Sequence, residues 1–477
     1  MALRQYRIPV FYGIHQGVTE NRVNEGESPD ACNMETRGGR LSVAKGYVRE
    51  NNVAFADPAS LKRIYVWNRA SGKRMLAATA NKLYSLDETA GEWKLIYTFS
   101  ASASAAQYDF QTVKIASTEY LLIASGVSQM AKWDGTAETA SAFGREEQLS
   151  NIAVNFVELY YARLFSAGDS NFPSRLYYSQ APGDDRTVEN WTVVEASENV
   201  GGGHVEVGTD SDPITGLFAL SNQLLIFKRD SLYRLLGDRP GNFRILPVNG
   251  TMQQPVHTAC VRVGDVLYFL TEGGMYYFDG QTVQRKADAD KVGDLLLGAN
   301  LSACAAASCR ERLYFAFREA SGDGVNDAVL VYDLARGVYM VRRGFHAPGV
   351  CAAGGTLYLM DGNGFFARFE EGDTYGGGRI DAYWKTPMTD LDAKSVSKRL
   401  EELYLRGSGG ILSVEAVTES GTVYNERLMP GSGERILELG LTGEGRAFQL
   451  VLRNVNGSRF TIDGGVELLV DLQRRAL

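Results

Sequence analysis

The sequence predicts an all-β fold, a β-propeller of about seven blades followed by a C-terminal β-sandwich. Three observations predict it. Short runs of alternating aliphatic and aromatic residues recur in pairs along the chain. The 52 glycines, against 12 prolines, lie between these runs, where glycine favours turns. The 24 tyrosines and 21 phenylalanines suit strands.

The repeated unit is a pair of short strands joined by a turn. Three copies are clear: residues 223–227 with 231–237, 266–270 with 275–280, and 356–360 with 364–369. Four weaker copies are 75–78 with 82–87, 121–124 with 130–135, 163–167 with 175–179, and 313–317 with 329–333. The units begin near residues 62, 113, 157, 214, 259, 302 and 349, a spacing of roughly 43 to 57 residues. This is the period of four-stranded propeller blades.

A small twisted sheet of this kind cannot bury both of its faces alone. Packing against neighbours around an axis buries the faces, and closing the ring protects the strand edges. Seven blades are favoured, with six or eight as alternatives. An irregular β-sandwich assembly or a β-solenoid is the competing interpretation.

Two segments flank the predicted propeller of residues 61–375. Residues 1–60 are expected to dock on the propeller or complete it. Residues 376–477 are expected to form the β-sandwich, with a glycine hinge at 376–378. Its predicted strands are 380–384, 400–405, 411–417, 435–441, 447–453 and 460–470.

Charge and apolar patterning exclude some classes. The formal charge of −8 and the pI of about 5.3 argue against a generic phosphate-binding surface. No apolar run has the length of a membrane-spanning helix, and the N-terminus lacks the apolar core of a signal peptide. The cysteines show no zinc-binding spacing and are interpreted as buried free thiols: Cys32, Cys260, Cys304, Cys309 and Cys351.

Candidate chemistry is sparse. The carboxylates at blade turns are predicted to cap turns rather than form a glycosidase pair: Asp230, Glu272, Asp279 and Asp361. The oxygen-rich stretches 210–212, 323–327 and 361–364 are interpreted as tight turns, since none completes an EF-hand. The glycine run 201–204 is interpreted as a loop. The sequence therefore predicts no enzymatic activity and no catalytic, cofactor-binding or metal-binding residues.

Two further sets of side chains have competing interpretations. The tryptophans are expected to pack in the core, with sugar-stacking platforms as the alternative: Trp67, Trp93, Trp133, Trp191 and Trp384. Four basic residues are expected on a solvated face, with a pore lining that slows DNA as the alternative: Arg342, Arg343, Lys394 and Lys398.

The order of several loose motifs resembles a broad family of tailed-bacteriophage tail proteins. The opening carries Asn33-Met34-Glu35 and then Lys45-Gly46-Tyr47, where the family pattern usually has Arg in place of Lys45. The remaining matches are 13–14, 25–31, 38–41, 174–179, 190–191, 214–217, 225–228, 232–234, 273–280, 380–386, 398–400 and 445–450, so the likeness spans most of the chain.

The resemblance implies a structural virion protein, a tail nozzle or hub that extends the DNA channel below the head–tail connector. It implies a hexameric ring, contacts with adaptor or connector proteins and with other tail proteins or fibres, and no membrane partner. Genomic DNA would pass through the lumen during ejection without sequence recognition. The location would be the virion tail, assembled in the host cytoplasm. The alternatives are a tail-tip receptor- or carbohydrate-binding propeller module and, third, a propeller hydrolase.

Overall fold

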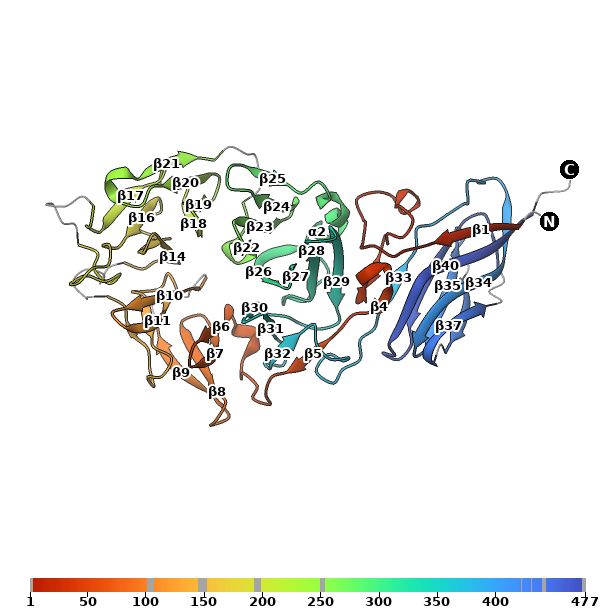
Figure 1. The fold of residues 1–477 in the computed structure, drawn as a ribbon, viewed down its shortest axis with the longest axis horizontal. Coiled ribbons are helices and arrows are strands. Elements are labelled where there is room, and N and C mark those ends of the chain that lie inside the picture. Colours follow the sequence, from red (N-terminus) through yellow and green to blue (C-terminus); the bar gives the residue numbers. More distant parts are fainter. Residues whose placement is uncertain are drawn as a thin grey trace.

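The computed structural model describes residues 3–100, 107–144, 152–192, 199–248, 254–421, 423–429, 431–439 and 443–473. A ring of small sheets occupies one end of the molecule, and a unit of longer strands that holds both termini occupies the other (Figure 1). Within the described residues, the ring contains seven four-stranded antiparallel sheets. The predicted propeller and its blade number are confirmed.

Six blades each use four consecutive strands. Blade 1 contains β6 (Arg63–Arg69), β7 (Gly72–Ala78), β8 (Lys82–Asp87) and β9 (Glu92–Thr98). Blade 2 contains β10 (Asp109–Ile115), β11 (Thr118–Ala124), β12 (Ala131–Trp133) and β13 (Ser141–Ala142). Blade 3 contains β14 (Phe156–Tyr160), β15 (Arg163–Ala167), β16 (Arg175–Tyr178) and β17 (Gly203–Glu206). Blade 4 contains β18 (Ile214–Leu220), β19 (Gln223–Lys228), β20 (Leu232–Leu236) and β21 (Arg244–Pro247). Blade 5 contains β22 (Cys260–Val263), β23 (Val266–Thr271), β24 (Gly274–Phe278) and β25 (Val283–Arg285). Blade 6 contains β26 (Asn300–Cys309), β27 (Arg312–Arg318), β28 (Ala328–Asp333) and β29 (Val338–Arg343).

Blade 7 joins strands from distant parts of the chain. It contains β30 (Gly349–Ala353), β31 (Thr356–Met360), β32 (Phe366–Phe369) and, from the N-terminal segment, β5 (Tyr47–Arg49). Tyr47 of β5 lies opposite Phe369 of β32. The Phe55 amide then donates to the Gly364 carbonyl at 2.7 Å. The N-terminal segment thus supplies the outer strand of the last blade and closes the ring.

The blades stack face to face around the axis. The first strands of neighbouring blades contact one another, so these strands line the axis. The second strands are covered on both faces, and every residue of β15 and β19 is buried. Aromatic pairs fill the space between blades, as where Phe227 of blade 4 meets Phe269 of blade 5 at 5.6 Å.

The short helices lie in connections. The 3-10 turns are η1 (Glu20–Arg22), η2 (Arg37–Gly39), η3 (Pro58–Ser60), η4 (Pro240–Asn242), η5 (His257–Ala259) and η6 (Ala289–Val292), and one α-helical turn is α2 (Gly293–Leu296). None of the helices in the described ranges is long and apolar enough to cross a membrane.

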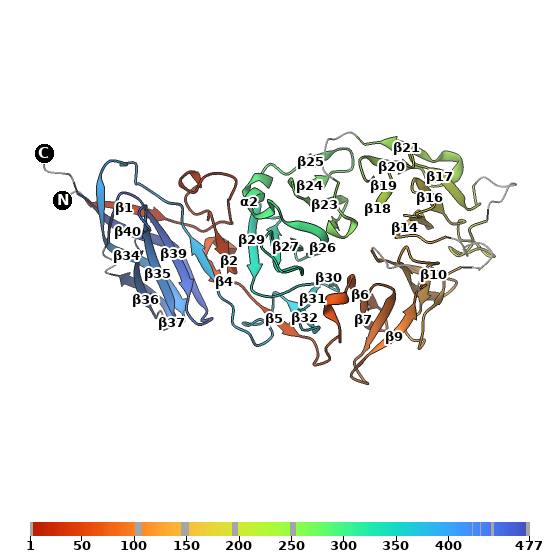
Figure 2. The same ribbon diagram turned by 180° about the vertical axis from the view of Figure 1, so that it is seen from behind.

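The C-terminal unit has two sheets, seen from the other side in Figure 2. One contains β1 (Leu3–Ile8), β3 (Met34–Glu35), β4 (Leu41–Val43), β34 (Ser397–Gly409), β37 (Gly431–Leu439), β38 (Gly443–Gly445) and β40 (Phe460–Gln473). The other contains β2 (Ala31–Cys32), β33 (Tyr383–Lys385), β35 (Leu412–Thr418), β36 (Val423–Leu428) and β39 (Phe448–Asn454). Buried side chains of both sheets, among them Leu403 and Leu452, belong to one apolar cluster. The β-sandwich assigned to residues 376–477 stays a prediction, and β1 to β4 come from outside that range.

Asn33 ties the propeller to the C-terminal unit. Its Nδ2 donates to the carbonyls of Arg343 at 2.9 Å and Asp381 at 2.8 Å. Its Oδ1 accepts from the Arg343 amide at 2.9 Å and the Tyr375 hydroxyl at 2.8 Å. One buried side chain therefore fixes the end of blade 6 against the segment that enters the second unit. The glycines after Tyr375 form a turn closed by mutual hydrogen bonds between Tyr375 and Gly378.

The solvated-face interpretation is wrong for Arg342 and Lys398, which are both fully buried. β29, the outer strand of blade 6, is covered by β2 and β3, so Arg342 lies inside the junction. The Arg342 guanidinium contacts Glu370 at 2.9 Å and Glu35 at 3.1 Å. Lys398 donates to three backbone carbonyls, which replace its hydration. Arg343 is partly buried and pairs with Glu319 at 2.7 Å.

The loop interpretation of residues 201–204 is also wrong in part. Gly203 and His204 belong to β17, the outer strand of blade 3, where His204 lies opposite Tyr177. A Cβ on Gly203 would lie 2.8 Å from the Tyr178 hydroxyl, so a larger residue at this strand position would require the Tyr178 side chain to shift.

Candidate functional site: the axial face of the propeller

The first strands of the blades begin on one face of the ring, and two cavities open among these strand starts. One has a volume of about 450 Å³ and is bordered by blades 1, 2, 5, 6 and 7. The other, of about 510 Å³, is bordered by blades 2, 3 and 4. Gln107, which precedes β10, lines both. Central cavities of this size are where propellers and other closed folds commonly hold ligands.

The first cavity exists because β26 carries small side chains. Its sequence runs Asn-Leu-Ser-Ala-Cys-Ala-Ala-Ala-Ser-Cys, and residues 302–308 line the space. Arg63 and Thr258 supply polar groups on the opposite walls. The cavity can therefore admit a small molecule but offers few directional contacts.

The second cavity is lined by Phe156, Pro213 and Pro255 together with polar side chains. Three buried oxygen atoms that line it have no hydrogen-bond partner among the described residues: Oε1 of Gln107, Oγ1 of Thr215 and Oε1 of Gln254. Buried polar atoms in native proteins are normally satisfied by protein, water or ligand. These atoms are polar points in a cavity whose lining is otherwise mostly apolar.

A cluster of charged side chains begins at Asp109, on the first strand of blade 2. Asp109 is buried, and its Oδ1 lies 3.3 Å from both the Arg63 Nη1 and the His257 Nε2 atoms. Its Oδ2 accepts the Val157 amide at 3.0 Å. Burial alone would raise the pKa of Asp109, but His257, Arg63 and the Val157 amide outweigh burial and lower it. The carboxylate is therefore ionised and joins three blades and η5.

Glu158, on the neighbouring first strand β14, behaves in the opposite way. Burial and the negative charge of Asp109 raise the pKa of Glu158 to about 8. At neutral pH, Glu158 is thus mainly a neutral acid beside an ionised Asp109. Two carboxyl groups with separated pKa values are a feature that active sites share with structural networks, so this pair alone does not assign chemistry.

The carboxylates singled out in the sequence do not meet at this face. Asp279 Oδ1 accepts the amides of Gln281 and Thr282, and Asp361 Oδ1 accepts those of Asn363 and Phe365, so both cap turns as predicted. Asp230 pairs with Arg229 at 3.1 Å. Glu272 lies exposed in the β23–β24 turn. In the ranges that the structure describes, no group of three His, Cys, Asp or Glu side chains is placed to hold a metal ion.

The tryptophans and cysteines have packing positions. Four tryptophans are buried, and the fifth, Trp93, is half-buried against Phe55 and Phe366. All five cysteines are free, three of them buried and two partly exposed. Burial raises the pKa of the Cys32 thiol to about 11 and that of Cys351 to about 12, which keeps both as unreactive thiols.

Sequence reasoning missed Asp109, Glu158 and His257 as a group. The available signal was their position, because Asp109 and Glu158 lie at or near the start of a predicted blade and His257 just precedes one. The first strands of all blades begin on the same face of the ring. Polar residues at these strand starts are therefore expected to lie close together on that face.

No protein-family model and no curated protein sequence matches the chain. Among solved structures, it is similar to the WD40 repeats of RRP9, with 11% identity and a TM-score of 0.44 over 69% of this chain and 99% of that one. It is also similar to YCF48 bound to a D1 peptide, with 11% identity and a TM-score of 0.39 over 68% of this chain and 97% of that one. Both neighbours are propellers, and the likeness concerns the fold alone.

Proposed function

We propose that this chain is a structural protein of a tailed-phage virion, a tail nozzle or hub that extends the DNA channel below the head–tail connector. One observation carries the proposal. Four residues of the N-terminal motif on which the family resemblance depends lie at the junction of the propeller and the C-terminal unit: Asn33, Glu35, Gly46 and Tyr47. The motif therefore holds the propeller and the C-terminal unit in a fixed arrangement within one protomer.

The junction is built from several independent contacts. Glu35 is held by Arg312 through two hydrogen bonds of 2.9 Å and by Arg342. Tyr47 stacks on Tyr375 with ring centroids 5.7 Å apart. The same N-terminal segment pairs with β40 through β1 and with β32 through β5, so it contributes a strand to each part. Rotation of one part against the other would break the contacts of Glu35 with Arg312 and Arg342, which cross the junction.

A rigid protomer suits a ring. A closed ring requires a fixed angle between the two surfaces through which each copy contacts its neighbours. Pre-organised geometry also avoids an ordering cost on assembly. The net charge of −8 favours a channel that DNA slides through rather than adheres to. The residues would act through interfaces, with no catalysis, in a hexameric ring that binds the connector or adaptor and other tail proteins.

The alternative, a tail-tip receptor- or carbohydrate-binding module, was expected to use exposed tryptophans. Because all five are buried or half-buried, tryptophan platforms give that alternative no support.

The test is the oligomeric mass of the purified full chain, alone and mixed with its virion's connector or adaptor protein, followed by negative-stain imaging. We expect rings with an axial hole wide enough for duplex DNA, or a stable complex with the connector. The connector of an unrelated phage serves as the mixing control. A persistent monomer that ignores its own connector would overturn the proposal.

A further inference from the structure

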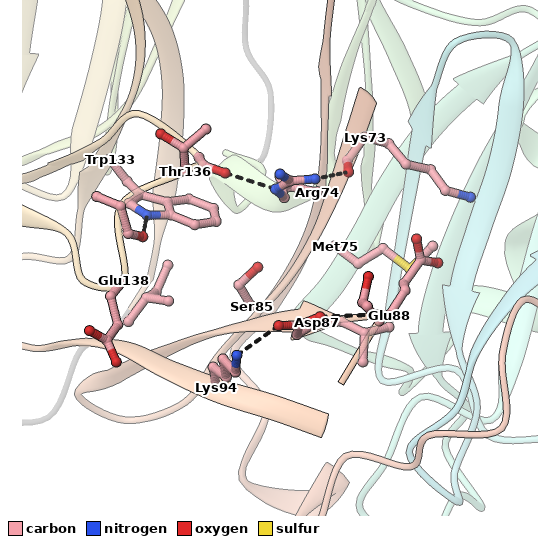
Figure 3. A pocket seen from close by; sticks show the side chains of 15 residues that line it. Lys73, Arg74, Met75, Ser85, Asp87, Glu88, Lys94, Trp133, Thr136 and Glu138 are labelled. Atoms are coloured by element: carbon pink, nitrogen blue, oxygen red, sulfur yellow. Dashed lines mark hydrogen bonds and ion pairs between the residues drawn. The ribbon is translucent and has the colours of Figure 1, made fainter. Parts of the chain in front are cut away.

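A pocket of about 420 Å³ lies between blades 1 and 2, away from the axial cavities (Figure 3). Blade 1 contributes β7, β8, β9 and the β8–β9 turn, and blade 2 contributes the end of β12 and the turn that follows it. We call it the interblade pocket. Its most informative lining residues are Arg74, Ser85, Asp87, Lys94, Trp133 and Glu138.

The floor of the interblade pocket is apolar but small. Ile96 is almost fully buried beneath it, and Trp133 is only 4% exposed. The Trp133 Nε1 donates to the Ala137 carbonyl at 2.8 Å, which fixes the ring in the wall. A ligand therefore meets a narrow apolar strip rather than a broad stacking platform.

The walls carry fixed polar groups. Lys94 Nζ lies 2.7 Å from Asp87 Oδ2, and Asp87 Oδ1 accepts the Thr89 and Ala90 amides. The Arg74 guanidinium donates to the Gly135 and Lys73 carbonyls at 2.8 and 3.2 Å, which uses two of its five N–H donors. Figure 3 shows these side chains around the same space, with Ser85 between them. The site is pre-organised before any ligand enters.

The charges of the lining balance. Two cations, Arg74 and Lys94, face two carboxylates, Asp87 and Glu138, whereas Lys73 and Glu88 point away from this space and Lys73 pairs with Glu50. A charged ligand would gain no net attraction from such a lining. A hydroxyl group both donates and accepts hydrogen bonds, so adjacent hydroxyls can use carboxylate and guanidinium neighbours together.

We infer that the interblade pocket binds a neutral, hydroxyl-rich ligand, a pyranose saccharide. Its hydroxyls would contact Arg74, Glu138 and the Asp87–Lys94 pair, and its C–H groups would meet only the narrow exposed strip of Trp133. This site goes beyond the proposed assembly role and does not depend on it, because glycan binding can be measured on the chain whether or not it forms a ring.

The test begins with the labelled full chain on an array of neutral, sialylated and sulfated glycans. Isothermal titration with the best neutral glycan then compares wild type with Arg74→Ala and Glu138→Gln. Matched controls are Arg244→Ala and Glu272→Gln, which change exposed residues outside the pocket. We expect each pocket variant to weaken binding about tenfold and each control to leave it unchanged.

Unaltered melting temperatures would show that both pocket variants fold, and Lys94→Met provides a third pocket variant if one does not. The inference is overturned if the chain binds no neutral glycan, if it binds only acidic glycans, or if neutral-glycan binding survives the folded pocket variants.

Discussion

The hydroxyl of Tyr375 donates a 2.8 Å hydrogen bond to Oδ1 of Asn33, which lies 342 residues earlier in the chain. Asn33 also has a φ of 55°, a left-handed conformation that asparagine adopts more readily than most residues. The side chain and the backbone conformation both specify asparagine at this point of the junction.

Replacing this residue, Asn33→Ala, is expected to lower the free energy of unfolding by about 3 kcal/mol or more, because several buried partners lose their hydrogen bonds together. Urea denaturation measures this loss in the free energy of unfolding. The matched control is Asn456→Ala, since Asn456 has a φ of 53° but is exposed. The control isolates the backbone contribution, and equal losses in the two variants would contradict the role of the Asn33 hydrogen bonds.

Arg342→Met is expected to destabilise the chain by about 3 kcal/mol, because it removes a fully buried cation and leaves the partly buried Glu35 and Glu370 with Arg312 alone. Arg379→Met removes an exposed ion pair with Asp381 and should cost less than about 1 kcal/mol. Chemical denaturation of both variants under identical conditions checks the difference. If Arg342→Met lowers the free energy of unfolding no more than the control does, Arg342 does not stabilise the junction.

The sequence predicted the propeller because each blade repeats a buried strand pair at a regular interval. The predicted starts near 214, 259 and 349 lie within one residue of the starts of β18, β22 and β30. Burial of the middle strands on both faces demands apolar runs, and such runs are visible without any knowledge of neighbours.

The junction could not be predicted in the same way. β1 pairs with β40, and β2 with β33, across almost the whole length of the chain, and short strands of two residues carry no periodic signal. Arg342 was assigned to solvent because nothing in blade 6 indicates that β2 and β3 cover its outer strand. The charged cluster at Asp109 could not be predicted for a related reason, since Asp109 and His257 come together only once the ring closes.

Gly46→Ala tests whether the Gly-Tyr pair of the motif is required by packing. A Cβ on Gly46 would lie 2.0 Å from the Thr374 carbonyl oxygen, so the backbones must separate and the stacking of Tyr47 on Tyr375 must shift. We expect a loss of about 2–3 kcal/mol, typical of forced overpacking. Gly293→Ala is the control, because nothing lies within 4 Å of its Cβ position. Similar stability of the two variants in urea would show that the backbones at Gly46 and Thr374 can separate at little cost in stability.

Glu158→Gln tests the axial carboxyl pair through pH. Glu158 ionises with a pKa of about 8 in the folded chain, against an ordinary 4.5. Because the folded pKa is raised, the unfolded state releases this proton first as pH rises, so the wild type loses stability between about pH 4.5 and 8. Glutamine mimics the neutral acid and cannot ionise. The melting temperature of the variant relative to wild type should therefore increase across this window and level off above it.

The exposed Glu272→Gln variant supplies the baseline for the same pH series. Asp109→Asn should show the opposite trend, because the lowered pKa of Asp109 stabilises the folded chain above the ordinary value of 3.8, and that stabilisation is lost as pH falls. Its loss should therefore be largest near neutral pH and fade in acid. If Glu158→Gln tracks wild type at every pH, the pKa of Glu158 is not raised in the folded chain, and the charged cluster at Asp109 extends only to Arg63 and His257.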